Sequence, residues 1–593
     1  MSTQNPTPKA AKNSYDPATL EARIQARWAE AGAGTPHEQT AKPGARGSEP
    51  FAILMPPPNI TGSLHLGHLL FLSLEDAMIR HARLSGLDAT WLPGTDHASI
   101  GASYMLERTL AAEGTSAQAL GREGYLARMR DFAATNQERI RGQIRGFGAL
   151  ADWSRETFTL GPRYTKASRA AFSILYERGL LERRETQITY CPHCATGLSD
   201  LELEMRDGGS SICGRCGTMT ECRTGRGWFA RMAPLAQALI AKLDAGALKI
   251  IPASAEATLR HWLDNITDWN LSRQLWWGQA IPAWTCRAGH ISTPQAPDYG
   301  DPEACAICAD SEISPDPDTL DTWFSSGLSP FAALGWPDIT GASGADYRRF
   351  YPTATLETGH DILFFWCARM LMLGLALTGE LPFKTLYLHG LLRDESGKKM
   401  AKTAGNGQDP STLLSSYGAD ALRWALIEGH APGLDARWQP DKLEASRRLG
   451  NKLWQAGRFL TLRGIISGAA QSEAFDPQAL SAPESELLSR HAQAARQIRA
   501  LMDAHRLHEA ASALREAFWH LFCDQHLELI KGLGPAATNE PATPLGASYA
   551  ALRASWRGYL ALFAPFWPHL TEELWSQIDG GASGLLIEAG YGL

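Results

Sequence analysis

Two histidines and several small residues stand between an expected strand and an expected helix. The segment 56–68 (PPPNITGSLHLGH) follows the apolar run 51–55, which predicts a buried strand. It precedes an apolar helical pattern at Leu70, Phe71, Leu74 and Met78. Small residues let a ligand approach the backbone, and a helix N-terminus favours negative charge. His65 and His68, with Gly67 between them, are therefore candidate contacts for a nucleotide phosphate.

A lysine-rich loop much later in the chain carries the complementary charge. It reads GKKMAKTAGN from Gly397 to Asn406. Lys399 and Lys402 can bring mobile ammonium groups onto a polyphosphate, where they would stabilise the charge that develops at a reacting phosphorus. The two segments together predict a nucleotide site that is assembled from distant parts of the chain.

The ten cysteines of this 593-residue chain suggest metal binding and not a disulfide scaffold. The pairs Cys191-x-x-Cys194 and Cys213-x-x-Cys216 have the spacing of a four-thiolate zinc knuckle, which leaves Cys222 over. A second cluster consists of Cys286, His290, Cys305 and Cys308. Its alternative is a decayed knuckle that ordinary packing holds together. Either zinc would be structural, because four protein ligands leave no open position for a water molecule.

The composition indicates a multi-domain protein without a membrane or secretion signal. With 44% hydrophobic residues, the chain can bury several cores, and we expect three or more domains. The apolar run 363–377 is interrupted, and residues 1–13 are polar, so we expect a cytoplasmic protein with a disordered leader. The net charge of −7 argues against general nucleic-acid binding but allows a local basic face. Residues 446–463 are a candidate for that face; the alternative is an ordinary solvated helix.

Strand and helix signals alternate in two separate stretches. Residues 1–48 combine the leader with a helix that has Pro17 in its first turn. Residues 49–185 and 346–445 predict two halves of a Rossmann-like doubly wound parallel sheet, an α/β fold. Between them, residues 186–227 and 228–345 form connective regions that carry the cysteine clusters. Residues 446–593 predict an all-α bundle of amphipathic helices, with a polar connection over 467–486.

Seven further segments give the chain a family resemblance. They are WLPGTDH (91–97), DWNLSRQLWWG (268–278), DTWFSS (321–326), TGHD (358–361), LHGL (388–391), YGADALR (417–423) and TEELW (571–575). With the histidine segment and the lysine loop, they resemble the class I aminoacyl-tRNA synthetases, and PPPN with DWNLSRQLWWG is most similar to valyl-tRNA synthetases. The resemblance covers about Tyr15 to Trp575. It implies a Rossmann-like catalytic core, zinc knuckles and a helical anticodon-binding bundle.

The resemblance also shows what is missing. The valyl family normally carries a large editing domain between its zinc-knuckle region and the Trp-Phe segment, and usually a C-terminal coiled coil. Here only residues 206–227 separate Met205 from Trp228, and the chain stops at Leu593. The chain therefore resembles a shortened valyl-tRNA synthetase without a proofreading domain.

The resemblance implies how ATP would bind. His65 and His68 would contact phosphate oxygens, and Lys399 and Lys402 would reach the β- and γ-phosphates of ATP bound with Mg²⁺. Lys402 would matter more. Gly67 would leave the floor open for adenine. Gly359 and Asp361 match the ribose clamp of the family, and the remaining nucleotide contacts would come from His389, Met400 and Thr403.

Two departures from the family pattern fall in this nucleotide site. Ala401 stands where the family has serine, which removes a hydrogen-bonding group, and Thr403 keeps a hydroxyl. His360 replaces an aromatic residue between the two ribose-clamp positions. Because both lysines are present, we expect slowed and not abolished activation. In the second metal cluster, Gly289 stands where the family has cysteine, so His290 would supply the missing ligand.

The resemblance also implies an amino-acid pocket. Asp96 would pair with the substrate α-ammonium, and Asn59 would lie close by. A buried aspartate without a partner is costly, so a cationic ligand group is a sensible partner. Pro57, Trp323 and Ile362 match the walls of a small apolar slot that should exclude isoleucine by size. The alternative is that these three are ordinary core residues. The segment 97–103 and Ser329 depart from the family pattern near this pocket.

The sequence allows three functions. The first is an enzyme that activates valine with ATP and transfers it to tRNA without editing. The second is a specialised paralogue that supplies aminoacyl-tRNA or an aminoacyl adenylate to a biosynthetic pathway or carrier protein. It could use a different small amino acid. The third, a non-catalytic tRNA-binding protein, conflicts with the retained histidines, lysines and aspartates. We expect a monomer whose partners are tRNA and a small amino acid.

Overall fold

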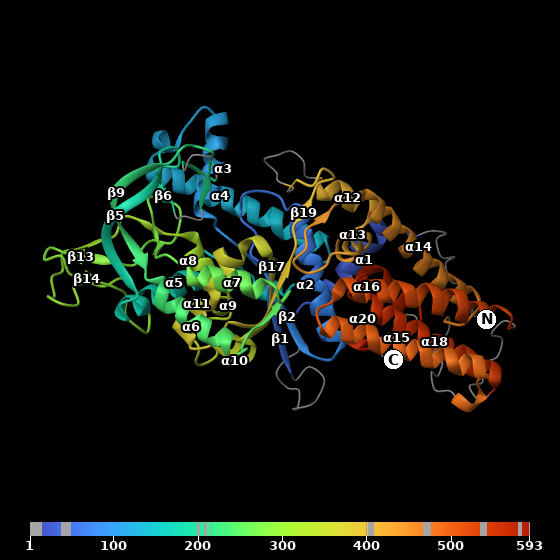
Figure 1. The fold of residues 1–593 in the computed structure, drawn as a ribbon. Helices are drawn as coiled ribbons and strands as arrows, with labels where there is room; N and C mark the ends of the chain where they lie inside the picture. Colours follow the sequence, from blue (N-terminus) through green and yellow to red (C-terminus); the bar gives the residue numbers. More distant parts are fainter. Residues whose placement is uncertain are drawn as a thin grey trace, which may run out of the picture.

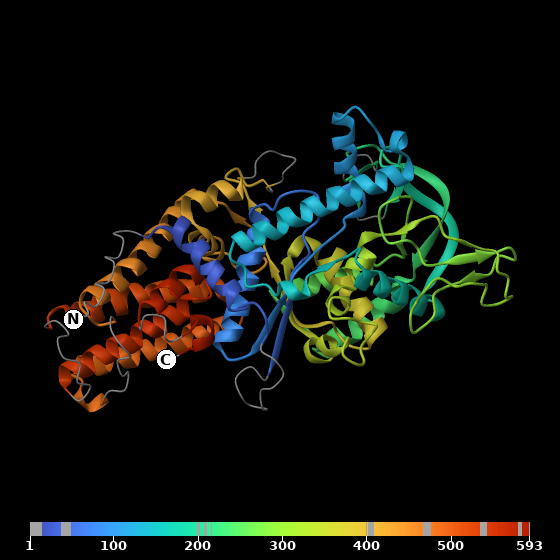
Figure 2. The ribbon, with the colours of Figure 1, turned by 180° about the vertical axis from the view of Figure 1, so that it is seen from behind.

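The computed structural model of the chain describes residues 15–36, 49–198, 202–206, 210–214, 216–398, 400, 408–466, 476–533, 543–578 and 584–591. These residues form two parts. An α/β part is built around a parallel sheet, and a helical part is formed by the C-terminal residues (Figures 1 and 2). The two parts lie end to end, so the molecule is elongated.

A five-stranded parallel sheet forms the centre of the α/β part. Its strands lie in the order β10 (Lys249–Ile251), β18 (Phe383–His389), β17 (Thr353–Gly359), β1 (Pro50–Leu54) and β2 (Asp88–Leu92). β1 and β17 are neighbours, with Ile53 paired to Thr355, and the sheet continues on both sides of this pair. This confirms the doubly wound α/β fold that the sequence predicts.

One strand of the sheet was not expected. β10 comes from the interval 228–345, which the sequence analysis assigns entirely to a connective region. The strand has three residues and pairs only with β18, at the edge of the sheet. Three residues are too few to give a recognisable strand pattern in a sequence.

The sheet is covered on both faces, as a parallel sheet requires. Neighbouring residues of β1 point into different cores. Ile53 packs in the core that contains α2 (Leu66–Leu84) and the helical part. Ala52 and Leu54 pack in the second core, with α5 (Pro162–Glu177), α6 (Met232–Asp244) and α11 (Arg369–Thr378). The sheet therefore lies between α2 with the helical part on one side and the helices α5, α6 and α11 on the other.

Among the described residues, one helical run is long and apolar enough to cross a membrane if only length and composition are considered. It spans His360–Thr378 and consists of η3 (His360–Ile362), η4 (Leu363–Ala368) and α11. More than half of it is buried, and α11 packs against α6 in the second core. Its apolar surface is therefore used inside the α/β part.

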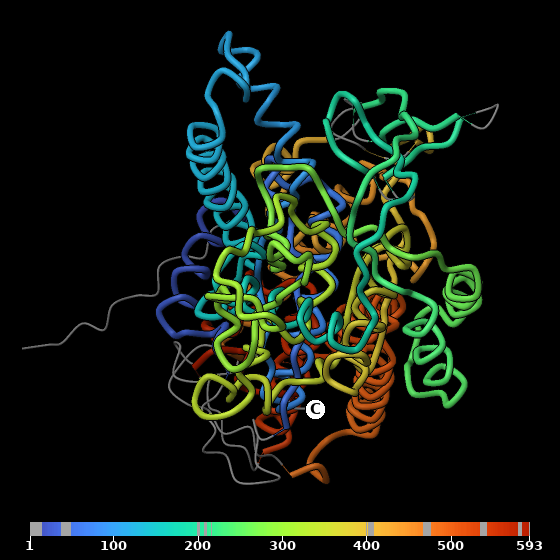
Figure 3. Tube along the Cα trace, turned by 90° about the vertical axis from the view of Figure 1, so that its left-hand side faces the viewer, coloured from blue at the N-terminus to red at the C-terminus, as the bar shows by residue number. Residues whose placement is uncertain are grey.

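A long antiparallel ribbon projects from the α/β part. Its strands β5 (Leu181–Cys191) and β9 (Glu221–Ala230) pair continuously from Leu181 opposite Ala230 to Tyr190 opposite Glu221. β6 (Thr196–Leu198) and β11 (Trp269–Asn270) flank them, and β7 (Leu203–Met205) with β8 (Ser211–Cys213) belongs to the connection between their far ends. Seen from the end, this ribbon and the pair α3 (Ser99–Ala112) and α4 (Ala117–Gly146) project on opposite sides (Figure 3).

Short elements complete the α/β part. They are β3 (Gly94–Thr95), β4 (Thr157–Phe158), α7 (Ala255–Asp264), β12 (Ser272–Arg273), β16 (Thr319–Leu320), α8 (Thr322–Ser326), α9 (Ser329–Ala332), α10 (Ala345–Phe350), β19 (Leu392–Arg393) and β20 (Ala436–Arg437).

The helical part follows α12 (Pro410–Tyr417) and α13 (Ala419–Ile427). It consists of α14 (Pro440–Leu462), α15 (Ala482–Asp503), α16 (Leu507–Glu516), η7 (Ala517–His526), α17 (Leu527–Lys531), α18 (Pro544–Phe563), α19 (Pro568–Ser576) and α20 (Leu586–Ala589). The connection expected over 467–486 is shorter than predicted. α15 already begins at Ala482, because Ser481 and Glu484 form a reciprocal capping box there. Residues 467–475 lie outside the described part of the chain.

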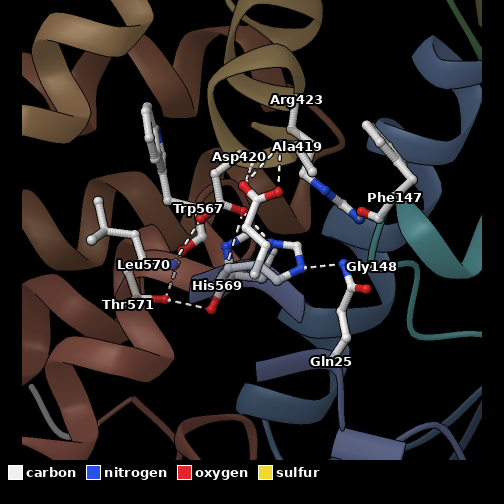
Figure 4. A network of polar contacts seen from close by, with 12 residues as sticks. Gln25, Phe147, Gly148, Ala419, Asp420, Arg423, Trp567, His569, Leu570 and Thr571 are labelled. Carbon is white, nitrogen blue, oxygen red and sulfur yellow. Dashed lines mark hydrogen bonds and ion pairs between the residues drawn. The ribbon is translucent and has the colours of Figure 1, made fainter. Parts of the chain in front are cut away.

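The N-terminal helix α1 (Pro17–Glu30) joins the two parts through buried polar contacts (Figure 4). Both carboxylate oxygens of Glu21 accept the backbone N–H of Ala419, the first residue of α13, at 2.8 and 2.9 Å. Asp420 accepts the backbone N–H of Leu570 at 2.8 Å and the Nδ1–H of His569 at 2.7 Å, at the start of α19. Gln25 donates to Nε2 of His569 and so returns the contacts to α1. We call Glu21, Gln25, Asp420 and His569 the junction ring.

Candidate active site

One cavity of about 430 Å³ opens at the carboxyl ends of β1, β17 and β18. The sheet order reverses between β1 and β17, and such a switch point is where α/β sheets bind their ligands. The lining includes the residues predicted for the nucleotide and the amino acid, namely Pro57, Asn59, His65, Gly67, His68, Asp96, Trp323, Gly359, Asp361, Ile362, His389 and Met400. Lys399, Lys402 and Thr403 lie outside the described residues.

The two histidines at the start of α2 hold each other in place. The His65 side chain accepts the backbone N–H of His68, and Nδ1 of His68 accepts the backbone N–H of His65 at 3.1 Å. Their ring centroids are 3.8 Å apart. A neutral imidazole that accepts at one nitrogen carries its proton on the other. Nε2 of His68 is therefore a donor, which suits a phosphate oxygen.

Gly67 also has a steric role towards its neighbour His65. A Cβ atom at this position would lie 2.9 Å from Cε1 of His65. Such an approach is too close for two carbon atoms, so glycine makes room for the imidazole of His65. Gly67 lines the cavity, and its place below adenine stays a prediction.

The last residues of β17 and β18 form the opposite end of the cavity. A Cβ atom at Gly359 would lie 2.6 Å from Oδ1 of Asp361 and 3.5 Å from Nε2 of His389. The carboxylate and the imidazole therefore converge on the space that glycine leaves open. Met400 lines the same cavity. A ribose has adjacent hydroxyl groups, and this pair of acceptors is suited to bind them.

His360, which stands where the family has an aromatic residue, makes a hydrogen bond with Asp435. Its Nε2 lies 2.8 Å from Oδ1 of Asp435, and Nε of Arg393 donates to Oδ2 of Asp435 at 2.7 Å. Burial raises the pKa of Asp435. The hydrogen bonds from His360, the backbone N–H of Leu391 and Arg393 outweigh this effect and lower the pKa to about 2. His360 is thus accommodated by polar contacts at the edge of the cavity, and it leaves the cavity open.

The amino-acid end of the cavity contains a buried carboxylate. Asp96 is 4% exposed, and it accepts the backbone N–H of Ala98 at 2.6 Å and the hydroxyl of Ser326. Among the ion pairs between described residues, none includes Asp96. A buried carboxylate without a cationic partner is costly, and an α-ammonium group of a ligand would neutralise it. Asn59, which pairs with Asp96 through a parallel bridge, stands beside it.

The apolar slot lies in the same cavity as Asp96. Pro57, Trp323 and Ile362 come from the segment after β1, from α8 and from η3, and all three line the cavity. The neighbouring hydroxyls are already engaged, since Thr322 donates to Oγ of Ser99 at 2.7 Å. The three walls therefore present mainly apolar surface to a small side chain.

Three buried charged side chains, which are linked by ion pairs, also line the cavity. Arg273 is fully buried, and its Nη2 lies 2.8 Å from Glu202 and 3.1 Å from Asp321. Burial alone would lower the pKa of Arg273, but the two carboxylates raise it above its ordinary value. Glu202 belongs to the short segment that follows β6, so Arg273 connects the projecting ribbon to the wall of the amino-acid slot.

The first cysteine cluster closes the far end of the ribbon. The ligand atoms of Cys191, Cys194, Cys213 and Cys216 all lie within 4.8 Å of one another. Sγ of Cys191 is 3.5 Å from Sγ of Cys216, and Sγ of Cys194 is 3.9 Å from Sγ of Cys213. Four thiolates at these distances can hold one zinc ion with no position left for water.

The second cluster stands on a small sheet of β13 (Trp284–Cys286), β14 (Ile291–Ser292) and β15 (Ile313–Pro315). Its ligand atoms also lie within 4.8 Å of one another, and Nδ1 of His290 is 3.9 Å from Sγ of Cys305. The backbone N–H groups of Cys308 and Ile307 lower the pKa of the Cys305 thiol to about 6. The structure therefore brings His290 to the position of a fourth ligand, and the donor set suits zinc.

Comparison with known proteins decides the family. Residues 23–439 match the model of the tRNA synthetases class I (I, L, M and V). Residues 484–591 match the anticodon-binding domain of tRNA ligase. The chain belongs to the class I aminoacyl-tRNA synthetases.

Relatives of this synthetase are similar along nearly its whole length. The valine–tRNA ligase of Dehalococcoides mccartyi is 34% identical over 717 aligned positions, which cover 96% of this chain and 78% of the relative. That of Clostridium acetobutylicum is 32% identical and covers 97% and 80%. The first alignment has more positions than this chain has residues, so that relative carries stretches inside the aligned span that this synthetase lacks.

Solved structures share the fold. The LeuRS–tRNA–LeuAMS complex from Agrobacterium radiobacter K84 is 18% identical, with a TM-score of 0.77, and covers 97% of this chain and 90% of that chain. Mycobacterium tuberculosis methionyl-tRNA synthetase bound by methionyl-adenylate is 17% identical, with a TM-score of 0.67 and coverages of 90% and 97%. At these identities the likeness shows the fold of the synthetase.

Sequence reasoning missed several polar residues in the cavity of this synthetase. Glu202, Arg273, Asp321 and Ser326 received no role, although the last three lie in the segments DWNLSRQLWWG and DTWFSS. The segments marked the family, but the partners of these side chains come from other segments. Ser326 donates a hydrogen bond to Asp96, and Arg273 donates one to Glu202.

Proposed function

We propose that this synthetase activates valine with ATP and transfers it to tRNA, without editing. The valine carboxylate would attack the α-phosphate of ATP, forming valyl-adenylate and releasing pyrophosphate. This step needs positioning and charge stabilisation and no covalent enzyme intermediate. His65, His68, Lys399 and Lys402 would act on the phosphates, and Mg²⁺ would accompany ATP. The observation that carries the proposal is Asp96, a buried carboxylate with no cationic partner among the described residues, in one cavity with an apolar slot and a nucleotide end.

Valine fits the amino-acid end of the cavity best. Asp96 would neutralise the α-ammonium group, and Pro57, Trp323 and Ile362 would enclose a short branched side chain. An indole and a proline ring are rigid, so the slot should not expand for isoleucine. The relatives from Dehalococcoides mccartyi and Clostridium acetobutylicum are named valine–tRNA ligases, which supports the same substrate.

The tRNA partner follows from the helical part, which matches an anticodon-binding domain. We propose that the bundle binds the anticodon arm of a valine-type tRNA while the cavity aminoacylates its 3′ end. The proposal includes a monomeric enzyme that acts in the cytoplasm. It also includes structural Zn²⁺ at the first cysteine cluster and a second Zn²⁺ at Cys286, His290, Cys305 and Cys308.

The shape of the ribbon supports the lack of editing. β5 and β9 pair until Tyr190 faces Glu221, and the residues between them form the first cysteine cluster and the short β7–β8 pair. This connection is far too short for a second catalytic domain. The longer relatives have room for such a domain within the aligned span.

A specialised role is the second candidate. The short connection between β5 and β9, and Ala401 in the lysine loop, would suit a paralogue that supplies aminoacyl-tRNA or an aminoacyl adenylate outside translation. Both candidates use the same first step, so they differ in which tRNA or carrier accepts the amino acid.

Aminoacylation of total tRNA with each amino acid, followed by identification of the charged tRNA, tests the proposal. Charging of a valine tRNA with valine supports the first candidate. Formation of valyl-adenylate without any charged tRNA supports the second. Failure of valine to drive ATP–pyrophosphate exchange, while another amino acid does, contradicts the assigned substrate.

Threonine tests the absence of editing. A valine slot rejects threonine only about a hundredfold, the established figure for valine-specific synthetases. We expect this enzyme to accumulate threonyl-tRNA and to leave preformed threonyl-tRNA intact at the spontaneous rate. Rapid deacylation by the pure protein would show that editing survives.

A further inference from the structure

Two buried glutamates lie beneath the nucleotide end of the cavity. Glu75 on α2 and Glu357 on β17 are both 0% exposed. Glu357 accepts the Nδ1–H of His389 at 2.5 Å, and Glu75 accepts the indole N–H of Trp91 at 2.6 Å. The second oxygen of each carboxyl group is buried without a hydrogen-bond partner in the described part of the chain. We call Glu75 and Glu357 the acid pair.

The acid pair does not carry two charges. Burial raises the pKa of Glu75 well above its ordinary value, and the nearby Glu357 carboxylate raises it further. Burial also raises the pKa of Glu357, but His389 opposes this effect. Two neighbouring buried carboxyl groups repel each other when both are charged, and only Glu357 has a hydrogen bond from His389, so the two do not both ionise. Glu75 is therefore the neutral acid, and Glu357 is the carboxylate that faces His389.

The groups around the acid pair do not replace His389 as its partner. Burial raises the pKa values of Tyr387 and Cys367, and burial lowers the pKa of His430 to about 4, so all three are neutral at pH 7. The ionisable groups packed around Glu357 and His389 are Glu75 of α2, Asp361 of η3, Cys367 of η4, Tyr387 of β18 and His430 after α13. Asp361 lies on the cavity side and has the same sign as Glu357.

His389 connects the acid pair to the cavity. It is the last residue of β18, it is 7% exposed, and it lines the cavity. In the tautomer that donates from Nδ1 to Glu357, Nε2 of His389 carries a lone pair and can accept a hydrogen bond. This lone pair and the Asp361 carboxylate converge on the space above Gly359. A hydroxyl group placed there can donate to Nε2.

We propose that Glu357 is a positioning residue, which holds His389 so that Nε2 accepts a hydroxyl of the nucleotide ribose, while Glu75 stays neutral beside it. The inference rests on the proposed binding of ATP in this cavity. It explains why two acids occupy positions that apolar residues would fill at lower cost. A lone charged Glu357 serves the imidazole, and a second charge at Glu75 would weaken that pairing.

The variant Glu357→Leu tests the proposal, because it removes the acceptor for Nδ1–H and leaves the cavity lining untouched. We expect the KM for ATP in pyrophosphate exchange to rise on the order of tenfold, with kcat nearly unchanged. The parent enzyme should bind one of the two deoxynucleotides, 2′-deoxyATP or 3′-deoxyATP, about tenfold more weakly than ATP. Glu357→Leu should lose this discrimination, since the hydroxyl no longer has a fixed acceptor.

A structural role of Glu357 would weaken the binding of ATP and of both deoxynucleotides alike. Unchanged discrimination in Glu357→Leu therefore overturns the proposal. Calorimetric binding of ATP and the two deoxynucleotides needs no amino acid, so it gives an answer even if valine is not the substrate. If Glu357→Leu does not fold, His389→Asn removes the acceptor without changing the acid pair and should lose the same discrimination.

Glu75→Gln is the matched control. An amide is as neutral as the protonated acid and can still accept the N–H of Trp91. We expect the KM for ATP and the ribose discrimination of Glu75→Gln to equal those of the parent. A loss of discrimination as large as that of Glu357→Leu would show that Glu75 carries the charge, which contradicts the assignment.

Discussion

Two buried clusters in the described part of the chain each combine two carboxyl groups with one histidine, and they differ in how the carboxyl oxygens are satisfied. In the junction ring, Glu21 and Asp420 accept backbone N–H groups at the starts of α13 and α19, and Asp420 also accepts from His569. In the acid pair, Glu75 and Glu357 each keep one buried oxygen without a partner among the described residues.

The difference follows from where the carboxyl groups stand. A helix start offers several free N–H groups and a positive dipole end, so a carboxylate there can be buried, ionised and fully bonded. The middle of a helix and of a parallel strand offers no free N–H, because α2 and β17 use their own. A fully satisfied cluster fixes a structure, whereas an incompletely satisfied one beside a cavity is expected to serve chemistry.

Metal analysis gives the largest expected effect. Glu21, Asp420 and His569 are close enough to hold a metal ion, as are the two cysteine clusters. The junction oxygens already accept N–H groups, so we expect zinc only at the cysteine clusters. Cys194→Ser should lose one equivalent of zinc and much of the stability of the ribbon, because structural zinc contributes about 10–16 kcal/mol to folding.

The controls for this measurement are Cys222→Ser and Asp420→Ala. Cys222 is exposed and lies outside both clusters. Both variants should keep the zinc content of the parent. Loss of a metal ion from Asp420→Ala would make the junction ring a metal site, and the contrast between a structural junction ring and a functional acid pair would no longer hold. A metal-free parent of full stability would contradict the zinc assignment.

Asp420→Ala should give the next largest effect. It removes a buried cap and leaves the N–H groups of His569 and Leu570 without an acceptor. We expect the free energy of unfolding to fall by about 3 kcal/mol, from the lost cap and the orphaned buried donors. Urea unfolding measures the loss, and the KM for ATP of the folded variant should stay that of the parent.

Arg23→Ala is the matched control for this prediction. Arg23 forms an ion pair with Glu573, which links the same helices α1 and α19, but its side chain is 62% exposed. An exposed pair contributes less than about 1 kcal/mol. Equal losses in Arg23→Ala and Asp420→Ala would mean that burial of the junction ring adds nothing.

The pH dependence of Glu75→Gln gives the smallest effect. Burial and the charge on Glu357 raise the pKa of Glu75 above the ordinary value of 4.5. The stability that Glu75 contributes is therefore complete below pH 4.5 and is lost as the pH rises towards the raised pKa. Glutamine does not titrate, so the variant should gain on the parent by up to about 1.4 kcal/mol between pH 5 and pH 6.

Urea unfolding at a series of pH values measures this gain. Glu113→Gln serves as the control, since Glu113 lies in an exposed pair with Arg128 and should show little change with pH. A constant difference between Glu75→Gln and the parent would mean that Glu75 is ionised in the folded protein.

Much of the candidate site could be predicted from the sequence, because it depends on local patterns. The apolar run before Pro56 gave β1, and the pattern after His68 gave α2. The ligand spacing of the cysteines indicated both clusters that the structure assembles. β10 was not predicted, because a three-residue edge strand has no periodicity, and the start of α15 was predicted too late, because a capping box was overlooked.

By itself the sequence determined the elements, the family and the types of ligand, because periodicity, turn residues and metal spacing involve only neighbours along the chain. Only the tertiary structure decided which partners the buried acids have. Glu21, Asp420 and His569 come from three helices, and Glu75, Glu357 and His389 come from one helix and two strands. Protonation depends on burial and on the nearest donors, and the fold brings those together from distant segments.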